Sequence, residues 1–435
     1  MVLALALTLV PGVAFAEKAT LRFVDTIPDQ NRQRVYQELI DEFNAKHDDV
    51  QIVYESVPWD QAHQKLVVMA GADNLPDILY VHTNWFSEFQ SAGWVLPLDN
   101  YYRNWALKDD LLPYVQKVLI DQDQVVPFGQ IIGIPCYLAT HALFVRTDWL
   151  NEAGIAKDSL KTWDDIFAAS AKLTDKAKNR YGFSFRGGRG GFDHMMFYVA
   201  AQTGGKLYDD KGVCTFNTPE AKAAVERFCA MYKNGEAPQD AANWGFQEMV
   251  QGFTAGLVGI LNQNADVIAN CKDVMQEGTW DTIPFPKSNV DGKMYSKADG
   301  FLYSISSDSK YPDAAWAFID FLLQPENNTK TCVISYNNPV TKTANQNEVF
   351  GEGPMASYSE ALLDPAFVRR PLYGYFAEVA EFQETFADSE LQKYILGVTT
   401  LDQFCDNIAN FLTTAQQKYM AEHPNVPIPS PSAIG

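Results

Sequence analysis

The segment FVRTDWLNEAGIAKDSLKTWDDIFAASAKLT, residues 144–174, decides the fold class of this chain. It starts at the end of an apolar run, 142–145, which predicts a buried strand. A short helix over 149–153 is expected next, because Asp148 is placed to cap it and Gly154 can end it in a left-handed turn. A strand followed closely by a helix indicates α/β scaffolding at this point of the chain.

A second helix is predicted to begin at Trp163 in the same segment. Thr162 caps it, and Asp165 follows three residues later as an incomplete capping-box partner. We interpret Trp149 and Trp163 as core anchors and not as ligand contacts. The apolar face of this helix carries Ile166, Phe167, Ala171 and Leu173.

Strands and helices alternate through the first part of the chain. Strands are predicted over 20–26, 50–54 and 78–81, and helices over 30–47 and 62–70. This alternation implies a parallel sheet with helices on both faces, whose ligands bind beyond the carboxyl ends of the strands. The loops that follow the three strands are therefore candidate ligand loops: 26–29, 56–60 and 82–85.

The charge balance and the length limit the possible functions. The chain has 34 basic and 54 acidic residues and a net charge of −20, which repels nucleic acid and anionic membranes but permits a neutral ligand. Single hydrophobic cores stop growing at about 250–300 residues. Because this chain has 435 residues, of which 47% are hydrophobic, we expect two lobes.

The N-terminus predicts export. Residues 1–16 form an apolar run that ends in Ala14-Phe15-Ala16, which is typical of a signal-peptidase site, and the run is too short to span a bilayer. No cysteine follows the cleavage point, so no lipid anchor is expected. No later segment approaches about 18 continuous apolar residues, so we expect no membrane span in the mature chain. A soluble periplasmic protein with a cleaved signal peptide is the interpretation.

The chain contains six widely spaced cysteines, and none of them forms a C-x-x-C motif. The periplasm permits disulfides, but six cysteines allow 15 pairings. Several buried free thiols and one or two bridges are equally compatible with the sequence. Cys214–Cys229 is the favoured local pair. The full set is Cys136, Cys214, Cys229, Cys271, Cys332 and Cys405.

Six short motifs occur in a fixed order over nearly the whole chain. They are AGADNLPDI (70–78), AGWVLPL (92–98), GQIIGIP (129–135), FTAGLVGI (253–260), the segment 306–323 and LGVTTLDQ (396–403). Together they resemble the marks of extracellular solute-binding protein family 1, the maltose-binding-protein-like receptors of ABC importers. The chain departs from the family pattern at Ile132, where tyrosine is usual, and at Gly259 and Ile260.

The resemblance implies an α/β, two-lobed periplasmic binding protein fold (type II), with discontinuous lobes joined by a hinge and a ligand cleft between them. The N-terminal lobe is expected at 17–135 and 287–345, and the C-terminal lobe at 136–286 and 346–435. Prolines at Pro135 and at 284–286 fit the flanks of the hinge, because proline stiffens the strand ends there. The proline-rich tail, 424–435, is expected to be extended and poorly ordered.

The family further implies a monomeric receptor that closes on a sugar or oligosaccharide and delivers it to the membrane subunits of the importer. A sensor-linked receptor is equally compatible with the sequence. No G-x-S-x-G, H-E-x-x-H, P-loop or EF-hand motif occurs, and the histidines lack metal spacing, so we expect no enzyme, no metal and no cofactor. A secreted carbohydrate-active enzyme stays as an alternative, because paired carboxylates are defined by their separation in space.

Aromatic side chains stand next to amides and acids in several predicted loops. Sugars need this combination, because their C–H faces stack on aromatic rings and their hydroxyls bind planar polar groups. Each residue has core packing as its alternative interpretation. The neutral candidates and acids are Asp29, Trp59, Asp60, His82, Trp85, Tyr137, Trp244, Asn262, Asn264, Asp299, Tyr336, Asn338 and Tyr373.

Arginines raise the question of the ligand's charge. The loop RGGRGGF, residues 186–192, places Arg186 and Arg189 where two guanidinium groups can clamp a carboxylate, sulfonate or phosphate. The alternative is a flexible surface loop with solvated arginines. Arg370 is a further cationic candidate, whereas Arg369 and Arg370 are not both expected in the cleft. A neutral sugar is favoured, and an anionic sugar or a glycerol phosphate ester is the second hypothesis.

Overall fold

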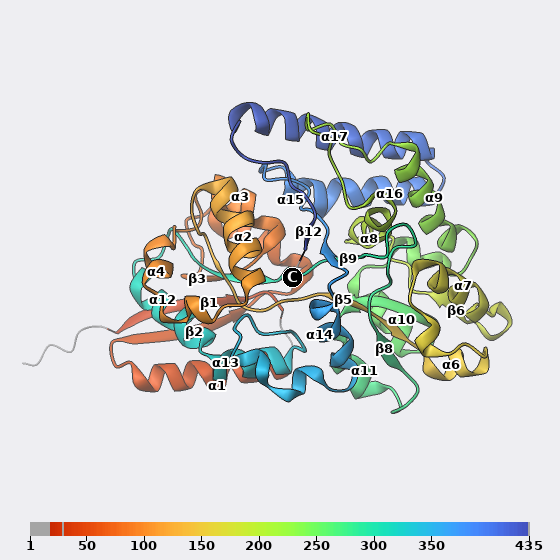
Figure 1. Ribbon diagram of the computed structural model, residues 1–435. Coiled ribbons are helices and arrows are strands. Elements are labelled where there is room, and N and C mark those ends of the chain that lie inside the picture. Colours follow the sequence, from red (N-terminus) through yellow and green to blue (C-terminus); the bar gives the residue numbers. More distant parts are fainter. Residues whose placement is uncertain (1–17, 28–29, 434–435) are drawn as a thin grey trace, which may run out of the picture.

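The computed structural model describes residues 18–27 and 30–433 (Figure 1). The expected signal sequence, 1–16, and the candidate Asp29 lie outside the described residues. The chain forms two lobes that lie side by side, each built around its own mixed sheet and covered by helices (Figure 1). The predicted α/β class with two lobes is confirmed.

The first lobe contains a five-stranded sheet in the order β2-β1-β3-β10-β4. Its strands are β1 (Ala19–Asp25), β2 (Val50–Ser56), β3 (Ile78–His82), β4 (Ile134–Pro135) and β10 (Phe301–Ile305). β1 pairs in parallel with β2 and β3, and β10 runs antiparallel to β3 and β4. The three predicted strands are confirmed to within two residues. The sheet was expected to be parallel but is mixed, because β10 follows a crossing from the second lobe and runs antiparallel to its neighbours.

Helices cover both faces of this sheet. α1 buries Leu39, Ile40 and Phe43 in the core, as the sequence predicts. α2 begins three residues earlier than expected, directly after Pro58. The helices of this lobe are α1 (Gln30–Lys46), α2 (Trp59–Ala70), α3 (Phe86–Ser91), α4 (Asp99–Asn104), α12 (Pro312–Leu323) and α13 (Pro325–Ile334). A helix with π-type hydrogen bonding, Val115–Val125, continues into α5 (Val126–Phe128).

The second lobe contains a four-stranded sheet in the order β6-β7-β5-β8. Its strands are β5 (His141–Val145), β6 (Tyr181–Phe183), β7 (Val258–Asn264) and β8 (Asp281–Ile283). β6 and β7 are parallel, whereas β5 is antiparallel to both of its neighbours. All residues of β5 are buried, which explains why this strand appears as an apolar run in the sequence.

In the segment after β5, Thr162, Asp165 and Gly154 take the capping roles predicted for them, but the expected cap Asp148 is wrong, because it lies inside the first turn of a helix that begins at Thr147 and has Arg146 at its N-cap. Thr162 and Asp165 form a complete capping box at the start of α7. Asp165, expected to be an incomplete partner, accepts the backbone N–H of Thr162 and so completes the box. Gly154 has a φ of +63°, the left-handed conformation expected of it. Trp149 and Trp163 are buried, which confirms them as core anchors. The helices of this lobe are α6 (Thr147–Glu152), α7 (Trp163–Leu173), α8 (Gly191–Thr203), α9 (Pro219–Lys233), α10 (Phe246–Thr254) and α11 (Val267–Val274).

A small third sheet lies between the two lobes. It consists of β9 (Met294–Ser296), β11 (Phe367–Arg369) and β12 (Ser432–Ala433) in the order β12-β11-β9. The tail was expected to be poorly ordered, and this expectation is wrong. β12 pairs antiparallel with β11, and Ser432 Oγ donates to Gln122 Oε1 at 3.0 Å. The carboxyl end of the described chain is therefore part of the structure between the lobes (Figure 1).

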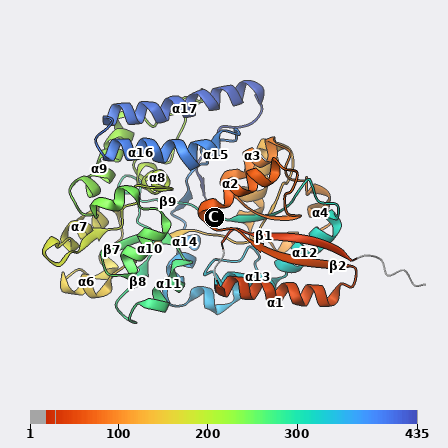
Figure 2. The same cartoon turned by 180° about the vertical axis from the view of Figure 1, so that it is seen from behind.

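The remaining helices are α14 (Ala356–Leu363), α15 (Val379–Glu381), α16 (Ala387–Ile395) and α17 (Leu401–Glu422). α15, α16 and α17 lie along one side of the molecule, whereas α14 packs against β5 and β11 (Figure 1). Figure 2, seen from behind, shows α17 extending from the second lobe toward the space above the first lobe. Near the end of α17, Tyr419 donates a hydrogen bond to the carbonyl of Pro127 at 3.3 Å. This helix therefore contacts both lobes.

The chain crosses between the lobes in segments that pair with one another. Ala139 forms a bridge with Asp299, and Leu138 forms one with Asn338. Ser288 donates to the carbonyl of Ala201, and β9 packs against α8, so the chain still lies on the second lobe after residue 287. These contacts favour a return to the first lobe at 297–300, about ten residues later than the boundary expected from the sequence.

All six cysteines are buried and free. The expected pair Cys214–Cys229 is wrong, because the two thiols lie in separate packing environments. Cys214 donates its backbone N–H to Thr413 Oγ1, and the Sγ of Cys229 lies 3.9 Å from the Sδ of Met195. In residues 18–27 and 30–433, none of the helices combines the length and the apolar character needed to cross a bilayer.

Candidate functional site

Rings gather at the carboxyl ends of the first-lobe strands, and we name Trp59, His82, Trp85 and Phe301 the aromatic wall. Trp59 opens α2 after β2 and stacks on Trp85 at 5.4 Å between ring centroids. His82 ends β3 and lies opposite Phe301 of β10, with ring centroids 4.9 Å apart. Trp85 is fully buried, while Trp59 and His82 are partly exposed. Trp59 is thus the indole of the wall that a ligand can reach, with Trp85 packed behind it.

Polar side chains gather at the facing side of the second lobe. We name this set the polar floor: His141, Arg186, Asp193, His194, Asn262, Lys297, Arg370 and Tyr373. Arg370 Nη2 and Tyr373 Oη both donate to Asp193 Oδ1, at 2.8 and 2.5 Å. Arg186 Nη1 lies 3.1 Å from His194 Nε2. The floor is therefore held together by hydrogen bonds and one ion pair, and not by stacked rings.

The glycine-rich loop before α8 aims Arg186 at the floor. α8 has no side-chain cap of its own, and Asp388 supplies one by accepting the backbone N–H groups of Gly190 and Phe192 at 2.6 and 2.9 Å. Gly190 has a φ of +83°, and a Cβ there would lie 2.7 Å from Arg186 Cζ. The loop is thus anchored and packed, which contradicts the alternative of a flexible surface loop.

Hydrogen-bonding capacity is left over at the centre of the floor. His141 Nδ1 donates to Asn262 Oδ1 at 2.6 Å, because a carbonyl oxygen can only accept. The neutral ring then keeps Nε2 as an acceptor, and Asn262 keeps Nδ2 as a donor. Both atoms are buried and have no hydrogen-bond partner, and the two residues are 2% and 1% exposed. A hydroxyl group can donate to the one and accept from the other.

Burial keeps the histidines of the cleft neutral. It lowers the pKa of His82 to about 3, and the positive charge of Lys297 adds to the effect. Burial also lowers the pKa of His141 and of His194 well below the usual value, with Lys297 and Arg186 acting in the same direction. These rings are therefore neutral groups that can form hydrogen bonds but carry no charge.

Arg189 connects the two lobes. Its guanidinium binds Glu384 Oε2 with bonds of 2.6 and 2.9 Å, lies 3.4 Å from Asp60 Oδ1, and sits over the Trp59 ring at 4.8 Å. Glu384 also accepts the indole N–H of Trp85 at 3.2 Å. We name this group of contacts the interlobe bridge. It covers the ring of Trp59 with a cation from the opposite lobe.

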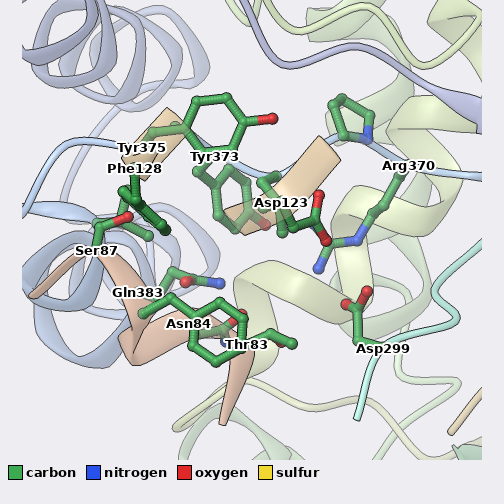
Figure 3. A pocket seen from close by; sticks show the side chains of 15 residues that line it. Thr83, Asn84, Ser87, Asp123, Phe128, Asp299, Arg370, Tyr373, Tyr375 and Gln383 are labelled. Carbon is green, nitrogen blue, oxygen red and sulfur yellow. The ribbon is translucent and has the colours of Figure 1, made fainter. Parts of the chain in front are cut away.

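A narrow cavity lies between the lobes beside the floor (Figure 3). Thr83, Asn84 and Gln383 line one side, and Arg370 and Asp299 line the other (Figure 3). It holds about 20 Å³, which is room for one or two water molecules and not for a sugar ring.

Arg369, the last residue of β11, and Arg370, the next residue, are both buried, but only Arg370 lines the cavity. Arg369 binds Asp299 at 2.7 Å and Asp123 at 2.8 Å, so the predicted ligand residue Asp299 is engaged by an arginine. Burial raises the pKa of Asp123 to about 6, while the pKa of Asp299 is lowered, because Arg369 and other cations outweigh its burial. Arg370 belongs to the floor.

The structure separates some predicted residues from this site. Trp244 packs its indole against Gly252 of α10 and is 7% exposed, which favours a structural role. Tyr137 is buried against Phe301 at the crossing, with ring centroids 6.0 Å apart. Asn338 donates to Ser359 Oγ at 3.0 Å. Tyr336 packs under Lys272. Asn264, by contrast, stays at the site, because it ends β7 directly opposite His141 of the floor and its buried Oδ1 has no hydrogen-bond partner.

Sequence reasoning did not select several members of the site: His141, Asp193, His194, Lys297, Phe301 and Glu384. Two signals were present. Asp193 and His194 fall in the first turn of the helix that follows the glycine-rich loop, and His141 begins the strand directly after the crossing. Lys297 carries no local signal, because its neighbours come from distant segments. Among the described residues, no group of three histidine, cysteine or acidic side chains is placed to hold a metal ion.

Residues 28–329 match the family of bacterial extracellular solute-binding proteins, and the chain belongs to this family. A solute-binding protein from Thermotoga lettingae, solved with α-D-tagatose, is similar in fold, with a TM-score of 0.78 and 19% identity over 92% of this chain and 100% of that one. The GacH receptor of Streptomyces glaucescens, solved without ligand and with acarbose, has a TM-score of 0.76 and 21% identity, covering 93% of this chain and 100% of its own.

Curated relatives are similarly distant. A binding protein of Brucella abortus is 22% identical over 348 residues, which cover 80% of this chain and 82% of the relative. The mannitol-binding protein of Pseudomonas aeruginosa is 25% identical over 310 residues, which cover 69% of this chain and 66% of the relative. These likenesses support the family and the fold, and the ligand has to be argued from the site itself.

Proposed function

We propose that this protein is a periplasmic receptor that binds a sugar or oligosaccharide between its lobes and delivers it to an ABC importer. The observation that carries the proposal is the pairing of a partly exposed indole, Trp59, with unused hydrogen-bonding atoms on His141 and Asn262 across the cleft. An aromatic face and a hydroxyl-reading pair are the two things that a pyranose needs. Relatives and neighbours whose names include mannitol, tagatose and acarbose support the same ligand class.

Closure on the ligand is the proposed mechanism. A ligand that touches both lobes binds the closed state more tightly and shifts the open–closed equilibrium toward it. Arg189 lies over Trp59, so a sugar that stacks on Trp59 has to displace this guanidinium or bind beside it. The importer's membrane subunits would then recognise the closed, loaded form. The proposed receptor acts as a monomer with hinges at 136–140, 297–300 and 346–352.

Export completes the proposal. The expected signal, 1–16, would be cleaved to leave a periplasmic receptor. The second candidate within the same class is a receptor for an anionic sugar or a glycerol phosphate ester, which the arginines of the cleft favour. A chemoreceptor-linked role would use the same closure.

A thermal-shift screen tests the proposal directly. Neutral mono-, di- and trisaccharides and their acidic derivatives are added separately to the purified protein. A true ligand at one hundred times its Kd stabilises the folded state by about 2.7 kcal/mol and raises the Tm. Failure of every carbohydrate to shift the Tm contradicts the proposal. The enzyme alternative is separated by a long incubation with the tightest ligand, in which a receptor leaves the sugar intact.

A further inference from the structure

Two cations in the cleft have no acid beside them. Within the described residues, no carboxylate oxygen lies within 4.0 Å of the charged nitrogens of Arg186 or Lys297. Lys297 makes no hydrogen bond there, and Arg186 bonds only His194, while its buried Nε has no partner. In a protein with a net charge of −20, acids are plentiful, so two unpaired cations at one place need an explanation.

The arginines that are buried in the described part of the chain are all paired. Arg32 binds Asp25 at 2.8 Å, Arg369 binds two aspartates, and Arg370 binds Asp193. This is the usual arrangement, because an uncompensated charge away from water is costly. Arg186 and Lys297 are partly exposed members of the polar floor, and neither has an acid paired with it.

Three of the acids nearest to these two cations are already engaged. Asp299 and Asp193, which lie toward Lys297, are held by Arg369 and Arg370. Asp388, the acid nearest to Arg186, uses both carboxylate oxygens to accept backbone N–H groups at the start of α8. A further acid near Lys297, Asp266 at the start of α11, is not held by a cation: its buried Oδ1 has no hydrogen-bond partner, and burial raises its pKa to about 6. The positive charge of Arg186 and Lys297 is therefore not cancelled by a direct contact.

The positive electrostatic field of the floor and its unpaired hydrogen-bond donors both favour a negatively charged ligand group. The pKa of His141 and of His194 is lowered by burial and then by Lys297, Arg186 and Arg370, so the floor is positive where these rings lie. Buried donors without a partner converge on the same region: Arg186 Nε, Asn262 Nδ2 and Arg370 Nε. A group with several acceptor oxygens and a negative charge satisfies these donors and both cations at once.

We propose that the ligand is an acidic saccharide whose carboxylate, sulfate or phosphate group is bound between Arg186 and Lys297, while its ring stacks on Trp59. This inference rests on the proposed function and selects one substrate class within it. Lys297 is its central residue, because it lies on the crossing segment between the lobes and can follow the ligand as they close.

Matched pairs of sugars test the charge. D-galactose is compared with D-galacturonate, and D-glucose with its 6-sulfate and 6-phosphate, by thermal shift and titration calorimetry. The acidic member of at least one pair is expected to bind at least tenfold more tightly than its neutral partner. The three acidic groups distinguish a carboxylate, a sulfate and a phosphate ligand. Equal or tighter binding of the neutral members overturns the inference and leaves the proposed sugar receptor standing, whereas no binding by any saccharide, oligosaccharides included, contradicts both.

Substitutions in the cleft test which cations bind the acidic group of the ligand. Lys297→Met and Arg186→Lys are each expected to weaken the acidic ligand at least tenfold, the second because lysine loses the bidentate fork. Lys293→Met is the matched control, since Lys293 is exposed on the same segment and outside the cleft. Unchanged affinity in both cleft variants overturns the inference.

Salt dependence keeps the test valid if a variant does not fold. On the unaltered protein, binding of the acidic sugar is expected to weaken severalfold between about 0.01 M and about 1 M salt. Binding of any neutral sugar stays constant over the same range. An acidic ligand whose affinity is independent of salt contradicts a charge-directed site.

Discussion

The aromatic wall and the polar floor face each other across one cleft but are built by different physics. The wall consists of rings that stack within the first lobe, and its members Trp59, His82 and Trp85 come from a short stretch of chain. The floor is assembled from segments between His141 and Tyr373, and it is held by charge and hydrogen bonds. Stacking accepts almost any sugar face, whereas fixed donors and charges accept few. In the proposed receptor, the wall would therefore supply affinity, and the floor would select the ligand.

The largest expected effect separates support from contact inside the wall. Trp85 is fully buried behind Trp59, so Trp85→Ala should lower the free energy of unfolding by about 3–5 kcal/mol through a cavity. Denaturant unfolding without ligand measures this change. Trp94→Ala is the matched control, because its indole is partly exposed and should cost clearly less. Equal losses in the two variants would show that Trp85 does not anchor the wall.

Trp59 tests the contact itself. Trp59→Ala should weaken sugar binding by about 1–3 kcal/mol, the scale of losing a large aromatic contact, with a smaller effect on unfolding because the ring is partly exposed. Trp59→Phe should retain part of the affinity. Titration calorimetry with the tightest saccharide measures both. If Trp59→Ala binds as tightly as the unaltered protein, the wall does not stack the ligand.

His82 of the wall should make the free energy of unfolding depend on pH. The pKa of His82 in the folded protein is lowered to about 3, so the unfolded chain binds more protons and stability is lost as pH falls below the unfolded value of about 6.5. His82→Gln should remove about 2 kcal/mol of the stability lost between pH 8 and pH 5. Parallel unfolding curves of both proteins at these pH values measure the difference. His47→Gln, at a partly exposed site on the far end of α1, serves as the control and should leave the loss unchanged.

The smallest expected effect concerns the interlobe bridge. Arg189→Met removes the contacts with Asp60, Glu384 and Trp59, which together favour the closed state by about 1 kcal/mol. The ligand-free molecule should open, and small-angle scattering should show a larger radius of gyration. Arg34→Met is the control, because Arg34 pairs only along its own helix surface. An unchanged radius in Arg189→Met would mean that the bridge does not hold the lobes together.

Much of the fold could be predicted from the sequence, because strands, helices and caps leave local patterns in it. Three strand ends and their helices were placed to within a few residues, and Thr162, Asp165 and Gly154 behave as their capping roles predict. The wall was accessible for the same reason, since Trp59, His82 and Trp85 directly follow parallel strands. The mixed strand directions of both sheets could not be predicted from the sequence. The antiparallel strands β10 and β5 join their sheets after the chain has crossed between the lobes, and no local sequence pattern marks these crossings.

The floor was only partly accessible. Arg186, Asn262, Arg370 and Tyr373 were selected from the sequence, but their partners were missed because each contact joins distant segments. Lys297 is the clearest case, since its importance comes from acids that are engaged elsewhere and not from its neighbours in the chain. Other residues carry the same aromatic and polar composition without reaching the cleft. Trp244 and Tyr336 are of this kind, so composition alone does not locate a site.

The six unbridged cysteines have a practical consequence for spectroscopy. All are buried, and burial raises the pKa of five of them, among them Cys229 and Cys405, to about 12, so their thiols are poorly reactive toward maleimide dyes. A cysteine introduced at an exposed position is then labelled selectively. Val68 on α2 and Val274 on α11 are 65% and 69% exposed and lie on opposite lobes. The double variant V68C/V274C would therefore report lobe movement by energy transfer in the otherwise unaltered protein.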